Sequence, residues 1–132
     1  MSIVRLLPAW LHAVADYAVG GLLIIVALAA GGSNKAVAAG VVVGGVVLAV
    51  SMLTKYPLGV VKVLPFTVHS AGDYLAAALL VLSPFVLNFH SGDAGLTAFY
   101  IVGGIAVLAV SLITNYPYSP KREWAPGAAA TA

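Results

Sequence analysis

The 132-residue sequence contains no cysteine and few charged side chains. Without cysteine, the chain can form neither disulfide bonds nor thiolate metal sites. Charged residues make up 8% of the chain, whereas soluble globular domains contain about 25%. The formal net charge of +2 indicates no nucleic-acid-binding surface. This shortage of charge predicts that most of the protein surface does not face water.

Apolar residues, which make up 62% of the chain, are concentrated in four long runs. Each run approaches the ~20 residues that a helix needs to cross ~30 Å of hydrocarbon. Backbone groups inside a bilayer must form hydrogen bonds within their own segment, so helices are favoured over open strands. The expected spans are residues 8–30, 36–54, 66–87 and 95–113. The sequence therefore predicts an all-α membrane protein with four transmembrane helices, whose surroundings are the lipid bilayer.

Two sequence patterns each occur twice. Leu-Pro-x-x-x-His-x-x-x-Asp-Tyr begins at Leu7 and at Leu64, and Leu-Ala-Val-Ser-x-x-Thr-x-Tyr-Pro begins at Leu48 and at Leu108. Such self-similarity indicates a tandem repeat. Each repeat starts and ends on the same side of the membrane, so we expect parallel repeats related by a pseudo-twofold axis along the membrane normal. The expected units are two helix-hairpin repeats, residues 1–58 and 59–118, and a disordered tail, residues 119–132.

Positively charged residues in short loops predict the orientation of these helices, because such loops stay in the cytoplasm. Only Lys35 falls on the side of the two hairpin turns. The other side, that of the termini and the central loop, holds Arg5, Lys55, Lys62, Lys121 and Arg122. We therefore expect a multi-pass protein of the cell (inner) membrane with both termini in the cytoplasm.

The first apolar run could also be a secretory signal peptide, with Arg5 as its basic region. It is long for such a segment, and it contains His12 and Asp16. It also matches the third run, which lies in the middle of the chain. We therefore expect it to remain as a helix of the mature protein.

Histidine and aspartate are the only basic or acidic residues in the expected spans: His12 and Asp16 in the first, His69 and Asp73 in the third. Residues four apart lie on one face of a helix. An aspartate near the bilayer centre costs ~2.5–3.5 kcal/mol on insertion scales. The four residues are therefore the candidate functional groups of this chain.

Three interpretations of these residues remain open. In the first, each aspartate bonds a histidine and holds the first span against the third. In the second, the four groups converge and hold a proton or a metal, since histidine and carboxylate ligands suit Zn, Fe or Mn. In the third, they line a small-ligand pocket that opens to the cytoplasm.

The sequence contains no nucleophile elbow, phosphate loop or zinc-protease pair, so we expect no enzyme and assign no cofactor. The leading hypothesis is a structural or accessory subunit, either a homo-oligomer or part of a larger membrane complex. The alternative is a transporter or another metal- or proton-handling membrane protein that uses the His/Asp pairs.

Residues at the ends of the spans are expected to have simpler roles. Tyr56 and Tyr116 are expected to anchor the membrane interface, although together with the threonines beside them they could instead extend a polar vestibule. Thr54 and Thr114 are expected to bond to the preceding helical turn. Asp93, in a short loop, is expected to face water. Small residues recur every four positions in the second span and predict close helix packing inside the bundle: Ala36, Gly40 and Gly44.

The segment Ser83-Pro84-Phe85 resembles the Ser-Pro-Trp signature of the bacterial SPW-repeat membrane proteins. Phe85 stands where the signature has Trp, and the first repeat has Val26-Ala27-Leu28 at the aligned positions. The resemblance implies a two-helix membrane repeat and no established activity, substrate or cofactor. Pro84 should bend the third helix near its end, and Ser83 is expected to satisfy part of the backbone that this proline leaves unbonded.

Overall fold

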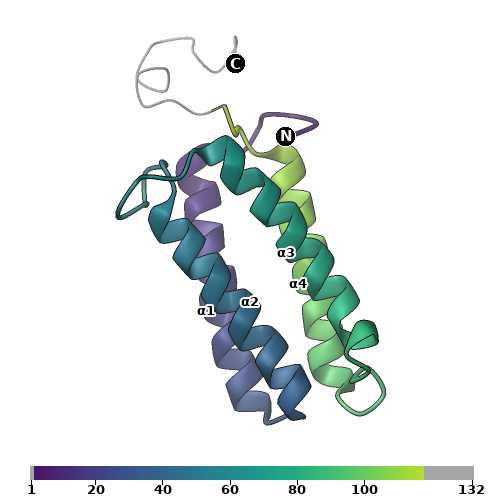
Figure 1. Ribbon diagram of the computed structural model, residues 1–132. Coiled ribbons are helices and arrows are strands. Elements are labelled where there is room, and N and C mark those ends of the chain that lie inside the picture. The colour runs from purple at the N-terminus through teal and green to yellow at the C-terminus, as the bar shows by residue number, and fades with distance from the viewer. Residues whose placement is uncertain (1, 118–132) are drawn as a thin grey trace.

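The computed structural model describes residues 2–117 and contains four consecutive helices (Figure 1). All four are long and apolar enough to cross a membrane. The prediction of four helices of transmembrane length is therefore confirmed, and the expected spans agree with the helix bounds to within two residues. The expected tail, residues 119–132, lies outside the described residues. The helices are α1 (Ala9–Ala30), α2 (Asn34–Leu53), α3 (Phe66–Val86) and α4 (Ala94–Ile113).

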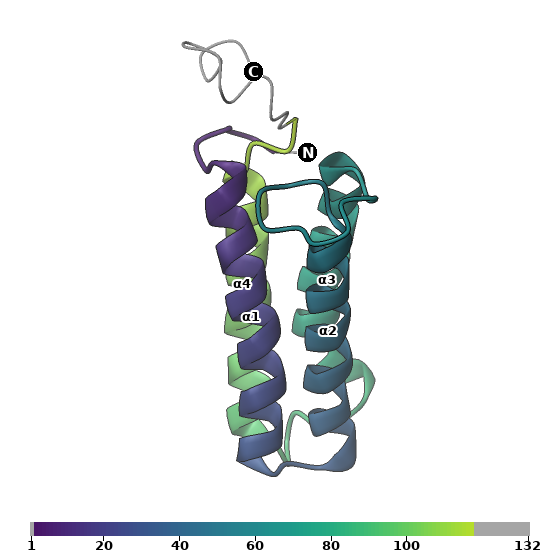
Figure 2. The ribbon, with the colours of Figure 1, turned by 90° about the vertical axis from the view of Figure 1, so that its left-hand side faces the viewer.

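The two ends of the bundle are built differently (Figures 1 and 2). One end, which we call the terminal end, holds residues 2–8 and the linker 54–65 that joins α2 to α3. The opposite end, the turn end, holds the two hairpin turns, residues 31–33 and 87–93. Consequently α1 and α3 run in the same direction, and the starts of both lie at the terminal end.

Each hairpin is closely packed because glycine lets the two helix backbones approach. A Cβ atom on Gly44 of α2 would lie 2.7 Å from the carbonyl oxygen of Gly20 in α1. A Cβ atom on Gly40 would lie 2.6 Å from the Cβ atom of Ala27. In the second hairpin, a Cβ atom on Gly104 would lie 2.8 Å from a backbone oxygen of α3. The prediction that Gly40 and Gly44 serve packing inside the bundle is confirmed.

The chain segments at the terminal end satisfy the carbonyl groups that end α2 and α4. The last carbonyls of a helix have no partner within the helix and need one outside it. The amide of Val60 donates to the Met52 carbonyl of α2 at 2.7 Å. In the same way, the amide of Ile3 donates to the Leu112 carbonyl of α4 at 2.7 Å. These bonds hold the chain across the terminal end, where it covers the interior of the bundle.

The two hairpin turns are bonded to each other at the turn end. The carboxylate of Asp93 accepts hydrogen bonds from the Ser33 amide at 2.9 Å and from the Ser33 hydroxyl at 2.6 Å. These hydrogen bonds lower the pKa of the Asp93 carboxyl group. The expectation that Asp93 only faces water was wrong, because the fold brings a second turn within reach of it.

Candidate metal centre

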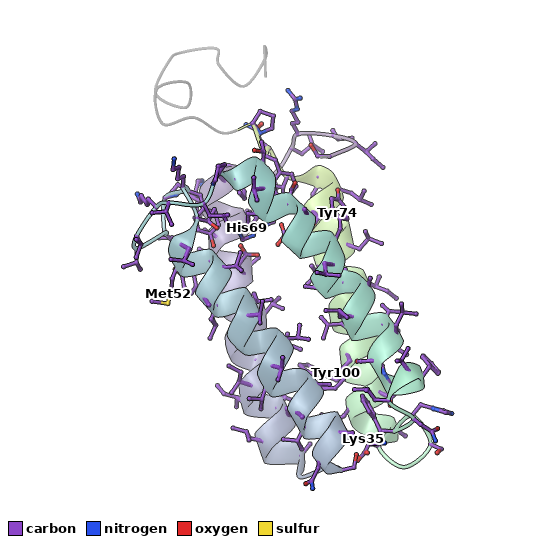
Figure 3. The ribbon with its side chains drawn as sticks, in the orientation of Figure 1. Lys35, Met52, His69, Tyr74 and Tyr100 are labelled. Carbon is purple, nitrogen blue, oxygen red and sulfur yellow. The ribbon has the colours of Figure 1, made fainter. Side chains whose placement is uncertain are left out.

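His12, Asp16, His69 and Asp73 come together in the structure and form what we call the His/Asp cluster. One ligand atom from each residue can be chosen so that all four lie within 4.8 Å of one another. Each residue is at most 8% exposed. Figure 3 shows His69 in the half of the bundle nearer the terminal end. The helical spacing of four residues aligns each pair on its helix. α1 and α3 lie diagonally across the bundle, and the side chains of the two pairs meet in its interior.

Each imidazole of the cluster lies between two carboxylates. The Nε2 atom of His12 is 3.2 Å from an oxygen of Asp16 and 3.2 Å from an oxygen of Asp73. The Nε2 atom of His69 is 3.2 Å from Asp16 and 2.9 Å from Asp73. Each carboxylate directs one oxygen to His12 and the other to His69. Two of these four short contacts, His12 with Asp73 and His69 with Asp16, therefore link α1 to α3, as the first interpretation expected.

Two threonines determine which nitrogen of each imidazole carries a proton. The Thr114 hydroxyl donates its only hydrogen to the Val110 carbonyl at 2.6 Å. Its oxygen, 2.7 Å from the Nδ1 atom of His12, must therefore accept a hydrogen bond from that nitrogen. Thr54 donates to its own preceding turn and accepts from His69 Nδ1 at 2.7 Å in the same way. Both histidines thus carry a proton on Nδ1 and direct Nε2 at the carboxylates.

The Nε2 atoms of His12 and His69 are buried and have no hydrogen-bond partner by geometry, although carboxylate oxygens lie 2.9–3.2 Å away. The oxygens are therefore not in line with the N–H direction of either ring. In a neutral imidazole with a proton on Nδ1, Nε2 presents a lone pair, and this lone pair would face anionic oxygens. Such a contact is repulsive unless positive charge lies between the atoms. Two protons or one divalent cation would supply that charge.

Two tyrosines from the terminal end bond to the carboxylates. The Tyr56 hydroxyl donates to Asp16 at 3.0 Å, and the Tyr116 hydroxyl donates to Asp73 at 2.5 Å. Burial raises the pKa of both phenols, and the nearby carboxylates raise it further, so both stay protonated donors. Each tyrosine is 1% exposed. The expectation that they anchor the membrane interface was wrong, because the chain turns inward after α2 and α4 rather than outward.

Phe66 separates the cluster from the terminal end. Its ring centroid lies 5.3 Å from that of His12 and 5.6 Å from that of His69. It also packs against Tyr56 and Tyr116 at centroid distances of 5.2 and 4.9 Å. One ring therefore contacts both histidines and both tyrosines, and it closes the cluster on this side.

Two cavities reach the cluster from the side of the turn end. The larger, of about 120 Å³, lies between α2 and α3 and ends on His69 and Asp73. The smaller, of about 50 Å³, ends on His12, Asp16 and Asp73. Their other walls are almost entirely valine, leucine and alanine side chains. Each exceeds the ~10–15 Å³ that one water molecule needs. The larger cavity also borders exposed side chains, Val42 of α2 and Leu75 of α3, so it opens to the outside between these helices. The third interpretation, a pocket open to the cytoplasm, stays a prediction.

The signature residues lie away from the cluster. Ser83, Pro84 and Phe85 belong to the last turns of α3 at the turn end, about 15 Å along the helix from Asp73. The helix continues through Pro84 to Val86, and the predicted bend stays a prediction. The Ser83 hydroxyl has no hydrogen-bond partner, so the expectation that it satisfies freed backbone was wrong. The structure gives these residues no contact with the candidate centre.

Sequence reasoning identified the four cluster residues but missed part of what surrounds them. The bonding of Thr54 and Thr114 to the preceding turn is confirmed, yet their contact with histidine was not expected. The tyrosines and threonines recur together in the second repeated pattern, whereas His and Asp recur in the first. Their joint recurrence was the signal that could have placed them at one site.

Comparison with known proteins gives no match: no family model, no curated protein and no solved structure is similar to this chain.

Proposed function

We propose that this is a small integral membrane protein that binds one divalent transition-metal ion at the His/Asp cluster. The convergence of two histidine nitrogens and two carboxylate oxygens within 4.8 Å carries the proposal. The unpartnered Nε2 atoms of His12 and His69 support it, because a metal ion accepts the lone pair that no protein donor meets. Imidazole nitrogen suits Zn or Fe, and carboxylate oxygen also suits Mn, whereas Ca and Mg favour oxygen ligands alone.

Distances and charge both suit such an ion. Four ligands at ~2.0–2.1 Å around a tetrahedral metal are ~3.3 Å apart. The Nε2–oxygen distances of 2.9–3.2 Å in the cluster are close to that separation. Two neutral imidazoles and two carboxylates carry a charge of −2, which one divalent ion neutralises. A neutral centre is favourable because net charge inside a membrane is expensive.

The residues behind the ligands also match a metal centre. Metal-ligating histidines donate their other ring nitrogen to a fixed acceptor, and ligating carboxylates are themselves hydrogen-bonded. Thr54 and Thr114 are these acceptors for the histidines. Tyr56 and Tyr116 are the corresponding donors for the carboxylates. We assign no catalytic role to the centre.

We further propose that the two hairpins are tandem repeats, about residues 1–58 and 59–118, arranged around a pseudo-twofold axis that passes through the cluster. The contacts that support this occur in pairs. His12 bonds Thr114 as His69 bonds Thr54, and both distances are 2.7 Å. Membership of the SPW-repeat family, a bacterial inner membrane and cytoplasmic termini remain proposals that rest on the sequence.

Elemental analysis of the protein, purified in mild detergent and titrated with zinc, tests the metal proposal. We expect one zinc ion per chain. In His12→Gln the zinc affinity should fall by more than the ~10–100-fold lost when a residue that only bonds a metal ligand is changed. His90→Gln is the matched control, because His90 is exposed in the hairpin turn and lies outside the cluster. Circular dichroism on both variants verifies that the helices remain.

The outcome of this titration decides between the two candidate functions. Unchanged zinc affinity in a folded His12→Gln protein would refute the metal centre. The structural or accessory role is the second candidate, and the two contacts that join α1 to α3 favour it. It predicts a stable homo-oligomer or a co-purifying membrane partner. An Asp16→Asn/Asp73→Asn double variant should then lose that assembly, whereas Asp93→Asn should keep it.

A further inference from the structure

The two ends of the bundle differ in charge. Within the described part of the chain, the terminal end carries three exposed basic residues, Arg5, Lys55 and Lys62, and no exposed carboxylate. The turn end carries Lys35 and Asp93, whose charges cancel. The terminal end therefore presents a positively charged surface, and the turn end does not.

Two short segments at the terminal end each place one basic residue among exposed apolar side chains. Residues 3–6 read Ile-Val-Arg-Leu, and residues 60–63 read Val-Val-Lys-Val. Ile3 and Leu6 are 78% and 74% exposed, and Val60 is 67% exposed. Side chains of this kind are rarely left in water as a group. Their exposure indicates that an apolar medium outside the protein covers them.

The backbone of both segments is held in place by the helix ends. Ile3 donates to the Leu112 carbonyl, and Val60 donates to the Met52 carbonyl, each at 2.7 Å. The segments therefore lie directly beyond the membrane-spanning helices and project from opposite sides of the bundle (Figure 1). At this depth a membrane changes from acyl chains to headgroups. Apolar side chains can insert into that boundary while a basic residue reaches the phosphates.

We propose that residues 3–6 and 60–63 bind anionic phospholipid headgroups in the leaflet that meets the terminal end. Arg5 and Lys62 contact the lipid phosphates, and the apolar side chains beside them insert between the acyl chains. The charge of the surface selects an anionic lipid over a zwitterionic one. This proposal rests on the surface of the protein and is independent of the metal centre.

Native mass spectrometry tests it on the full-length chain in mixed micelles of phosphatidylglycerol and phosphatidylcholine. The wild-type protein should retain phosphatidylglycerol in preference to phosphatidylcholine. Each basic residue near a membrane surface contributes about fivefold, so Arg5→Gln/Lys62→Gln should bind phosphatidylglycerol about 25-fold more weakly. Lys35→Gln, which removes the same charge at the turn end, should bind like wild type.

Two further measurements test whether the apolar side chains insert into the membrane and whether the bound phosphate belongs to a lipid. Ile3→Ser/Leu6→Ser should reduce retention of both lipids, because insertion does not depend on headgroup charge. Inorganic phosphate should not displace phosphatidylglycerol, since it lacks acyl chains. Equal retention of the two lipids by wild type would overturn the proposal. So would an equal loss in Lys35→Gln, or displacement by inorganic phosphate.

Discussion

Replacing Thr114 with valine removes one hydroxyl group and keeps the shape of the side chain. In the wild-type protein this hydroxyl oxygen lies 2.7 Å from His12 Nδ1, and the hydroxyl donates to the Val110 carbonyl. His12 is 1% exposed, and valine fills the same space as threonine, so the change opens no room for a water at the lost acceptor. A buried donor left without a partner costs about 1–3 kcal/mol. The Thr114→Val protein should therefore be less stable by that amount.

The same change should weaken metal binding. Without an acceptor for Nδ1–H, neither the tautomer nor the ring orientation of His12 is held. Loss of a residue that bonds a metal ligand typically weakens metal affinity ~10–100-fold, which corresponds to about 1.4–2.7 kcal/mol. The expected loss in metal-binding free energy is therefore similar in size to the expected loss in folding stability, about 1–3 kcal/mol. Thr54→Val should weaken zinc binding to a similar extent, because the Thr54 hydroxyl oxygen lies at the same distance of 2.7 Å from His69 Nδ1.

Competition between the protein and a chromophoric chelator for zinc measures the effect, and detergent-induced unfolding measures stability. Thr97→Val is the matched control, because Thr97 also belongs to α4 and its hydroxyl has no hydrogen-bond partner. Thr97→Val should bind zinc like wild type and be no less stable. If Thr114→Val also matched wild type, the assignment of the proton to His12 Nδ1 and the role of the threonines would be wrong.

Two other predictions concern the fold. Gly44→Ala should destabilise the protein by about 1–3 kcal/mol in detergent-induced unfolding, since its Cβ would overlap the Gly20 carbonyl oxygen; Gly45→Ala, with open space around it, should not. The lowered pKa of Asp93 predicts that its link to Ser33 stabilises the fold above the usual Asp pKa of 3.8 and is lost as the pH falls through the lowered value. The unfolding midpoint of wild type should therefore approach that of Asp93→Asn in acid, and a constant difference would contradict this.

Much of the architecture could be predicted from the sequence because it depends on local properties. The length and apolar content of each run determine that it forms a helix able to cross a membrane. Pro8 and Pro65 directly precede α1 and α3, and proline suits the start of a helix because it lacks a backbone N–H. The spacing of His12 and Asp16 likewise places both on one helical face. None of these inferences needs the position of a second helix.

The surroundings of the candidate site could not be predicted in this way. Tyr56 follows a membrane helix, and at such positions tyrosine usually faces the interface. It turns inward here because the linker amides bond to the end of α2 and draw the chain across the bundle. The expectation for Asp93 was wrong because its hydrogen-bond partner, Ser33, lies in the other hairpin and is far from it in the sequence.

The sequence by itself determined four apolar helices and two His/Asp pairs, because helix formation and helical periodicity are properties of neighbouring residues. Only the tertiary structure decided that these pairs meet, with each imidazole 2.9–3.2 Å from both carboxylates. Distances between helices depend on where side chains allow close approach, as Gly44 does against Gly20. Contacts between α1 and α3 therefore follow from the packing of the whole bundle.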